Sequence, residues 1–514
     1  MTTQHNTLSK SRPNLLVNVF FFLFVLAVLI IHVTVFLKLN LNFIDSDQPY
    51  MWMGANDYAR GLFYEPRYYA QDYNTFLEAL FAVPFIWMNI PVYYAVPIAT
   101  HLVFLFPFLF TSFYLFFKGK KMNAILVLAV IMCLPADYDL LTSLPRGFVS
   151  GLFFVSFFVI NILNPYNLYF VALNTFLAIV GYFVNPNSVV VSAPFLFFIF
   201  LHHYKNPRYY KIIIPCLALA WPAHVFFNQF YIDHRDYVMN DIHYQFSPDF
   251  FWKNLSDLDT RFAHLSFFIP NNCLALLFAL LLLVTGFYKT NKKAFASFFV
   301  FAAVILFAFC SGKTTEGSAW AYMSYGRMYL GIPLFISIFL SVFDFKMVRV
   351  YSVFFCVPLL FSAYKVPRLD KLLAWHYDVK HFHGVRLITL KSALEVVGFY
   401  KNACEKKQVD FLLISNRFWL NNFICYGGPA IYPDFPGTQE TRLEKRYWVR
   451  NQNKDKIFKR FMMLSSSRYL DQLMPRSPFF ETENIDGYGL LLIKNNTLKT
   501  GDFINYVNRY EPND

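Results

Sequence analysis

The chain is 514 residues long, and 57% of these residues are hydrophobic whereas only 15% are charged. A water-soluble protein cannot cover that much apolar surface, so the composition excludes a soluble enzyme. The formal net charge is +13. Because the positive residues recur in short segments between apolar runs, we attribute this charge to orientation in a membrane and not to nucleic-acid binding.

Apolar runs that approach or exceed the roughly 20 residues of a membrane crossing recur up to residue 366. We predict a polytopic α-helical membrane protein with about eleven transmembrane helices. The predicted spans are residues 15–39, 92–117, 122–136, 147–163, 168–184, 187–203, 211–230, 271–288, 294–311, 328–345 and 350–364. Residues 1–366 are expected to form a transmembrane domain with an outward loop at 40–91. Residues 367–514 contain no further span and predict a small soluble α/β domain.

Lysine and arginine indicate how the chain is oriented. They gather in segments 10–12, 118–121, 202–211, 289–293 and 346–349. Short positive loops lie on the cytoplasmic side of a membrane. Nearly all acids of the transmembrane half fall in the intervening loops, which therefore face outward. An odd number of spans then places the C-terminal domain on the outside as well.

The loop between the first two predicted spans is rich in carboxylates. They are Asp45, Asp47, Asp57, Glu65, Asp72 and Glu78, and aromatic residues fill the intervals. A carboxylate at a bilayer surface is poorly placed for folding alone, because its burial is unfavourable unless it is paired or hydrogen-bonded. The pattern therefore predicts a reaction centre at the membrane interface.

Three segments of the sequence carry a family resemblance. Asp47 and Gln48 are followed by DYARG at residues 57–61 and QDYNTFLEA at 71–79, YGRMYLGIPL stands at 325–334, and FWL at 418–420 with YGG at 426–428 is a weaker match. This layout resembles the GT-C glycosyltransferases, and in particular the bacterial family-39-like group of protein O-mannosyltransferase and aminoarabinose transferase type. One departure is Gln48, which stands where the group has a glutamate. A metal-binding or paired-acid role for this position is therefore in doubt, although Asp45 could supply the second carboxylate.

The resemblance implies an integral-membrane glycosyltransferase of the bacterial inner (plasma) membrane. Such an enzyme transfers a hexose or pentose from a polyprenyl-phosphate donor to a periplasmic or extracellular acceptor, which is a glycolipid, a polysaccharide or a protein. The resemblance implies no cofactor. We predict no metal site, because nothing in the sequence supports a bound divalent cation. The transfer needs a carboxylate that removes or orients the acceptor proton. We predict Asp47 for this role, with Asp45 and Glu78 as further catalytic candidates.

The leaving group is a phosphate, so the site also needs a permanent positive charge. We predict Arg327 for this contact because it lies where an outward loop becomes a span, with Lys313 in the same loop as an assistant. The matched segments imply that Gln71, Asp72, Tyr73 and Tyr329 contribute to substrate binding. Arg60, Arg67 and Arg146 are weaker candidates for the phosphate contact.

Three alternatives stay open. The chain could instead be a lipid-linked oligosaccharide flippase, a polymerase or another transporter without transferase activity. A transporter places ionisable residues along a pathway within the membrane, and the predicted spans hold almost none. The Asn185-Pro186-Asn187 turn either lines a lipid groove or is a plain turn. Cys404 and Cys425 could form a disulfide, which their spacing cannot establish.

Overall fold

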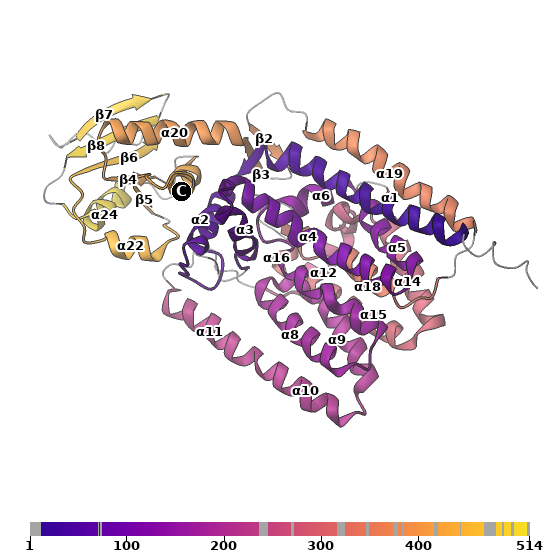
Figure 1. Cartoon of the computed structure of the whole chain (residues 1–514). Coiled ribbons are helices and arrows are strands. Elements are labelled where there is room, and N and C mark those ends of the chain that lie inside the picture. The colour runs from indigo at the N-terminus through magenta and orange to yellow at the C-terminus, as the bar shows by residue number, and fades with distance from the viewer. Residues whose placement is uncertain are drawn as a thin grey trace, which may run out of the picture.

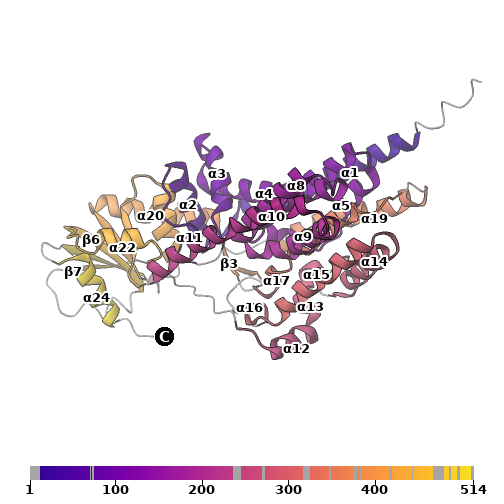
Figure 2. The same ribbon diagram turned by 90° about the horizontal axis from the view of Figure 1, so that it is seen from below.

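The computed structural model describes residues 12–69, 71, 74–235, 245–268, 272–315, 324–345, 349–373, 379–382, 385–415, 420–442, 444–466, 480–485, 488–494 and 498–510. Figure 1 shows a large helical body and, at one end of it, a smaller part that contains most of the strands. Figure 2 shows the same two parts from below. The fold is therefore mostly helical with a small C-terminal α/β part.

The helical body contains α1 (Arg12–Val35), η1 (Phe36–Asn40), α2 (Gln48–Ala59), α3 (Leu77–Trp87), α4 (Val92–Phe117), α5 (Lys121–Met132), α6 (Ala136–Ser143), η2 (Ser150–Phe157), α7 (Phe158–Leu163), α8 (Leu168–Val184), η3 (Pro186–Ser188), α9 (Val189–His203), α10 (Pro207–Ala218), α11 (Ala220–Asp233), α12 (Pro248–Ser256), α13 (Leu258–Arg261), η5 (Ala263–Leu265), α14 (Leu274–Thr290), α15 (Lys292–Phe309), α16 (Gly312–Thr315), α17 (Ser324–Arg327), α18 (Ile332–Leu340) and α19 (Arg349–Leu373). The C-terminal part contains β2 (Val379–Phe382), β3 (Val385–Thr389), α20 (Leu390–Lys406), β4 (Phe411–Ile414), η6 (Phe423–Gly427), α21 (Gly428–Ile431), β5 (Gly437–Glu440), α22 (Tyr447–Asn453), β6 (Arg460–Ser466), β7 (Phe480–Ile485), β8 (Tyr488–Lys494) and α24 (Thr500–Tyr510). β1 (Phe43–Asp45) lies between η1 and α2.

Several helices have the length and composition of membrane spans. Five of those in the described ranges pass this test: Leu15–Asn40, Val92–Phe117, Pro186–His203, Pro207–Asp233 and Lys292–Phe309. A sixth candidate is the pair α5 and α6, which is bent by 87°. The protein is therefore a membrane protein with several apolar helices of membrane length, and the number of eleven spans stays a prediction.

Local chemistry explains where individual helices end. At the end of α4, Gly119 has a φ of +80°, and the N–H groups of Gly119 and Lys120 donate to the carbonyls of Phe116 and Leu115. This pair of hydrogen bonds is the Schellman motif, which glycine permits at a positive φ because it lacks a Cβ. α5 stops at Met132, short of the predicted 136, because Pro135 disfavours helical geometry in the residue before it.

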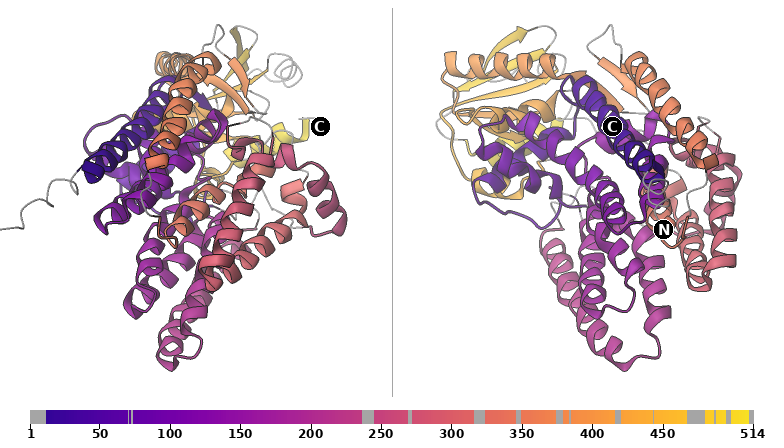
Figure 3. Two further views of the ribbon diagram at one scale, coloured as in Figure 1. Left: turned by 90° about the vertical axis from the view of Figure 1, so that its right-hand side faces the viewer. Right: turned by 45° about the vertical axis from the view of Figure 1, so that its right-hand side comes forward.

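A buried polar cluster joins three helices of the body. Lys365 of α19 lies with its Nζ 2.5 Å from Oδ2 of Asp139 in α6, and Nε2 of His32 in α1 is 4.0 Å from the other carboxylate oxygen. The helices α1 and α19 run side by side in Figures 1 and 3. Asp139 and Lys365 lie just outside the predicted spans 122–136 and 350–364, and they are nevertheless buried. The opposite charges of Lys365 and Asp139 make their joint burial tolerable.

Two sheets organise the C-terminal part. The larger one has the order β5-β4-β6-β8-β7, in which β4 is parallel to β5 and β6, while β8 is antiparallel to β6 and β7. The smaller one has the order β1-β3-β2 and pairs Asp45 with Leu387. The segment β1, which carries Asp45 of the outward loop, is therefore held in a sheet by β3 and β2 from the start of the C-terminal part. Cys404 and Cys425 are buried free thiols, so they form no disulfide.

Candidate active site

Asp45 and Asp47 meet at one arginine. Nη2 of Arg146 donates to Oδ2 of Asp47, and Nε of the same side chain lies 3.3 Å from Oδ2 of Asp45. Oδ1 of Asp45 also accepts from the backbone N–H of Asp47 at 2.8 Å and of Gln48 at 3.3 Å. Asp45 thus shapes the turn before α2, and Arg146 arrives from the loop between α6 and η2.

The two carboxylates differ in exposure and in charge state. The side chain of Asp45 is fully buried, whereas that of Asp47 is 38% exposed. Burial raises the pKa of Asp45 by more than Arg146 lowers it. Burial also raises the pKa of Asp47, but the charges of Arg146, Lys445 and Arg327 outweigh it, so this pKa lies below its usual range. Asp47 is therefore the accessible carboxylate that stays ionised.

Glu78 lies apart from this pair, in the first turn of α3, and is completely buried. Its two carboxyl oxygens accept from the hydroxyls of Thr100 at 2.9 Å and Ser150 at 3.0 Å. Burial raises the pKa of Glu78 to about 7, against the opposing effect of the hydrogen bonds from Thr100, Ser150 and the backbone of Gly147. These contacts tie α3 to α4 and to the start of η2, so Glu78 holds the loop that carries Arg146.

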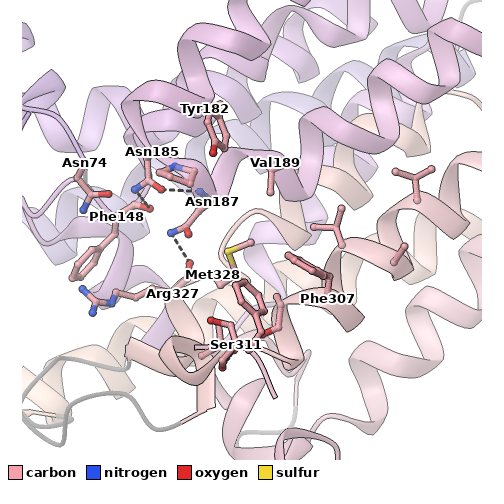
Figure 4. Close-up of a pocket in the computed structure, with 17 residues that line it drawn as sticks. Asn74, Phe148, Tyr182, Asn185, Asn187, Val189, Phe307, Ser311, Arg327 and Met328 are labelled. Carbon is pink, nitrogen blue, oxygen red and sulfur yellow. Dashed lines mark hydrogen bonds between the residues drawn. The ribbon is translucent and has the colours of Figure 1, made fainter. Parts of the chain in front are cut away.

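A cavity of about 550 Å³ is lined by Arg327 and Phe148 among others, but not by Asp47 or Arg146. Figure 4 shows that Asn74, Asn185, Asn187 and Arg327 gather at one end of it, while Phe307 lies at the other. The remaining lining residues are mostly apolar, and α15 supplies the largest group of them: Phe148, Tyr182, Pro186, Val189, Phe246, Val300, Ala303, Val304, Ala308, Ser311, Thr314 and Met328. The cavity therefore joins a polar head to an apolar trough.

Phe148 connects the cavity to the ion pair. The guanidinium carbon of Arg327 lies 4.7 Å from the centre of its ring, and that of Arg146 lies 5.7 Å from it. Both distances allow a cation–π attraction. Two positive groups thus flank one aromatic ring at the polar end of the cavity, and one of them also binds Asp47.

The Asn185-Pro186-Asn187 turn fixes this end of the cavity. Nδ2 of Asn185 donates to the carbonyl of Gly147 at 2.6 Å, and Nδ2 of Asn187 donates to the carbonyl of Arg327 at 3.1 Å. Both asparagines line the cavity. Of the two interpretations of the turn, the structure supports a lining role in addition to the change of chain direction.

The other predicted site residues are dispersed. Gln71 is half-buried and donates its backbone N–H to Tyr68 at 2.9 Å. Tyr329 is completely buried and packs on Phe262, with ring centres 4.9 Å apart, so it supports the wall behind Arg327. Asp72 and Tyr73 lie outside the described residues, and so does the side chain of Lys313. The roles of these residues in substrate binding stay predictions.

The C-terminal part contributes residues that motif reasoning did not identify. Nζ of Lys445 lies 4.0 Å above the ring of Tyr50 in the first turn of α2. Asn422 accepts from the hydroxyl of Tyr50 at 2.6 Å and donates to the carbonyl of Ser46 at 2.8 Å. No local motif distinguishes Lys445 or Asn422, because their importance depends on a long-range contact with the segment around Asp47.

No protein-family model matches this sequence, and no curated protein is significantly similar to it. Among solved structures, the chain is similar to the crystal structure of ArnT from Cupriavidus metallidurans bound to undecaprenyl phosphate. The TM-score is 0.55 and the identity 12%, and the match covers 91% of this chain and 97% of that one. At this identity the likeness shows the fold. The chain therefore shares the fold of ArnT.

Proposed function

We propose that this protein is a membrane glycosyltransferase that takes a sugar from a polyprenyl-phosphate donor and transfers it to a hydroxyl or amine of an extracytoplasmic glycan, lipid or protein. One observation carries the proposal: a cavity has Arg327 at its polar end and an apolar trough, and the charge of the same Arg327 helps to keep Asp47 ionised. A polyprenyl phosphate has the same two parts, an anionic head and an apolar tail. The ArnT structure with undecaprenyl phosphate supports this class of ligand.

The apolar trough suits an isoprenoid chain. Val300, Ala303, Val304 and Phe307 recur at helical spacing and present one face of α15 to the cavity. A second cavity of about 480 Å³, between α8, α9 and the α10–α11 arm, shares Tyr182 and Val189 with the first. The two cavities are therefore neighbours, and in our proposal a long lipid tail extends from the first toward the second.

The polar head suits the phosphate and the transfer step. Transfer breaks the bond between the anomeric carbon and the donor phosphate oxygen, and forms a bond from that carbon to the acceptor. In our proposal Asp47 accepts the proton that the acceptor loses. The electron pair of the broken bond leaves with the polyprenyl phosphate, whose charge faces Arg327. Asp45 holds Arg146 in place, and Glu78 holds the loop from which Arg146 extends.

We further propose that this site and the C-terminal part face the periplasm or exterior of a bacterial inner membrane. The alternation of basic and acidic loops supports this orientation. Reporter fusions at Lys120 and at Asp434 are expected to give opposite compartment signals. Matching signals would reject the orientation.

Donor use can be tested with the purified protein and a panel of radiolabelled polyprenyl-phosphate sugars. At least one donor is expected to lose its sugar to an added acceptor extract. Ala303→Trp fills the trough and is expected to raise the donor KM at least tenfold. Leu306→Trp is the matched control, because Leu306 lies on the same helix, is 46% exposed and is not among the residues that line the cavity. Absence of transfer from every donor would reject the proposed function.

A second candidate is a flippase or transporter, and one observation favours it. The cluster of His32, Asp139 and Lys365 is buried among helices of the body, and transporters use such groups as ion relays. Flux of a fluorescent lipid-linked sugar across proteoliposomes, lost in Asp139→Asn and accompanied by no transfer to an acceptor, would support this function instead.

A further inference from the structure

The C-terminal α/β part contacts the segment from β1 to the start of α2, which carries Asp45 and Asp47. β3 pairs with β1 and places Leu387 opposite Asp45, and the N–H of Leu390 donates to the carbonyl of Asn42 at 2.7 Å. Asn422 forms hydrogen bonds with Ser46 and Tyr50, which follow β1 in the chain. The segment from β1 into α2 is therefore held by β3 and by Asn422, both of the C-terminal part.

We propose that the C-terminal part completes the active site, and that Lys445, placed over the ring of Tyr50, is a positioning residue that supplies the third positive charge around Asp47. This inference rests on the proposed function and deepens it. It assigns a catalytic task to a part of the chain that would otherwise be a cap over the membrane helices.

The place of Lys445 is determined by buried neighbours. Its backbone N–H donates to the hydroxyl of Tyr426 at 3.2 Å, and the rings of Tyr426 and Tyr50 lie 4.2 Å apart. The next residue, Arg446, is buried and binds Glu444 through Nε at 2.7 Å. Because both sides of Lys445 are anchored, its side chain extends from a rigid base over Tyr50.

Tyr50 links Lys445 to Asp47, because it contacts both residues. Its backbone N–H donates to the carbonyl of Asp47 at 3.2 Å, so Tyr50 in the first turn of α2 is bound to the N-cap residue of that helix. The hydroxyl of Tyr68 donates to the same carbonyl at 2.8 Å. The ammonium group of Lys445 therefore lies over Tyr50, whose backbone is hydrogen-bonded to that of Asp47, the proposed base.

The charged groups that face Asp47 come from four directions. Asp45 lies on the preceding strand, Arg146 on the loop after α6, Arg327 at the end of α17 and Lys445 in the C-terminal part. Burial opposes the ionisation of Asp47, and the three cations favour it, while the charge of Asp47 raises the pKa of Asp45. Of these three cations, Lys445 is the one that the C-terminal part supplies.

The test measures the ionisation of Asp47 directly. Full-length protein in detergent is labelled with a carbodiimide, which reacts with protonated carboxyls, and fragmentation mass spectrometry separates the label on Asp47 from that on Asp45 between pH 3 and 8. No donor is needed. The variants are Lys445→Met, Lys445→Gln and Lys445→Arg, and the control is Lys391→Met, which removes the same charge from a side chain in α20 that is 85% exposed.

Loss of the charge is expected to raise the labelling midpoint of Asp47 by about one pH unit in Lys445→Met and Lys445→Gln. Lys445→Arg and Lys391→Met are expected to follow the wild type. In transfer assays, the acidic limb of the kcat/KM profile is expected to move by the same amount, with the donor KM unchanged. Labelling midpoints of Lys445→Met and Lys445→Gln that coincide with the wild type would overturn the inference. A shifted midpoint without transfer by the wild type would instead leave Lys445 beside Asp47 and reject the proposed function.

Discussion

Arg146 and Asp47 form an ion pair although 99 residues separate them in the chain. Neither residue could hold the other in place alone, because Asp47 is partly exposed and Arg146 sits in a loop. The pair is stabilised from both sides: Asp45 binds the second edge of the guanidinium, and Glu78 fixes the start of η2. This relationship keeps a charged acid beside Arg146, whose guanidinium lies 5.7 Å from the ring of the cavity residue Phe148, and it motivates the first prediction.

Asp47→Asn is expected to lower transfer about 10²–10⁴-fold while leaving the unfolding temperature nearly unchanged, because it removes a proton acceptor from a partly exposed position. Asp45→Asn is expected to retain more activity and to lower the free energy of unfolding by about 1–3 kcal/mol, because it removes a partner of Arg146 in a buried site. Steady-state kinetics and thermal unfolding of both variants check this pair. The reverse order of activities would assign the base to Asp45.

Arg327 is expected to bind the donor phosphate. Arg327→Ala is expected to raise the donor KM about 10- to 100-fold, since a hydrogen bond to a charged group contributes about 1.5–3 kcal/mol. Arg327→Lys retains the charge and loses the two-pronged geometry, so a smaller increase is expected. Arg208→Ala is the control, because Arg208 is exposed in the first turn of α10 and does not line the cavity. Unchanged kinetics of Arg327→Ala would place the phosphate elsewhere.

Glu78 is expected to make stability depend on pH. Its pKa rises from the ordinary 4.5 to about 7 in the folded protein. A raised carboxyl pKa stabilises the fold fully below pH 4.5, and this stability is lost as the pH rises through about 7. The loss amounts to about 3 kcal/mol.

The unfolding temperatures of the wild type and Glu78→Gln at pH 5 and pH 8 test this effect. The wild type is expected to lose more stability than the variant on going to pH 8. Glu440, whose pKa burial and the charge of Glu444 also raise to about 7, is present in both proteins and cancels in the comparison. An equal loss in the two proteins would mean that Glu78 is ionised throughout.

Gly151 is expected to tolerate no side chain. A Cβ there would lie 2.6 Å from the carbonyl oxygen of Asn185 and 2.8 Å from that of Gly181. Gly151→Ala is expected to destabilise the protein by about 1–3 kcal/mol and to raise the donor KM, because it displaces the turn that lines the cavity. Gly398→Ala in α20 is the control: its Cβ meets Tyr432 at 3.5 Å, and about 0.5–1 kcal/mol of added stability is expected. Equal unfolding temperatures of Gly151→Ala and the wild type would contradict this prediction.

The helical character of the body and the approximate ends of many helices could be predicted from the sequence. Residues 92–117, 168–184 and 187–203 were expected to be helical, and α4, α8 and η3 with α9 occupy these positions. Apolar composition over a fixed length is a local property, so it can be read without neighbours. The span predicted at 328–345 shows the limit, since the helix there covers only Ile332–Leu340.

What the sequence determined by itself is the membrane character, the acid-rich loop with Asp45, Asp47 and Glu78, and the GT-C-like layout. The tertiary structure alone decided which charges surround Asp47, because Arg146 and Lys445 reach it from distant segments through contacts that no spacing rule describes. It also decided that Lys365 and Asp139 are buried together. Ion pairs and cavities depend on distances between elements, and those distances exist only after the helices have packed.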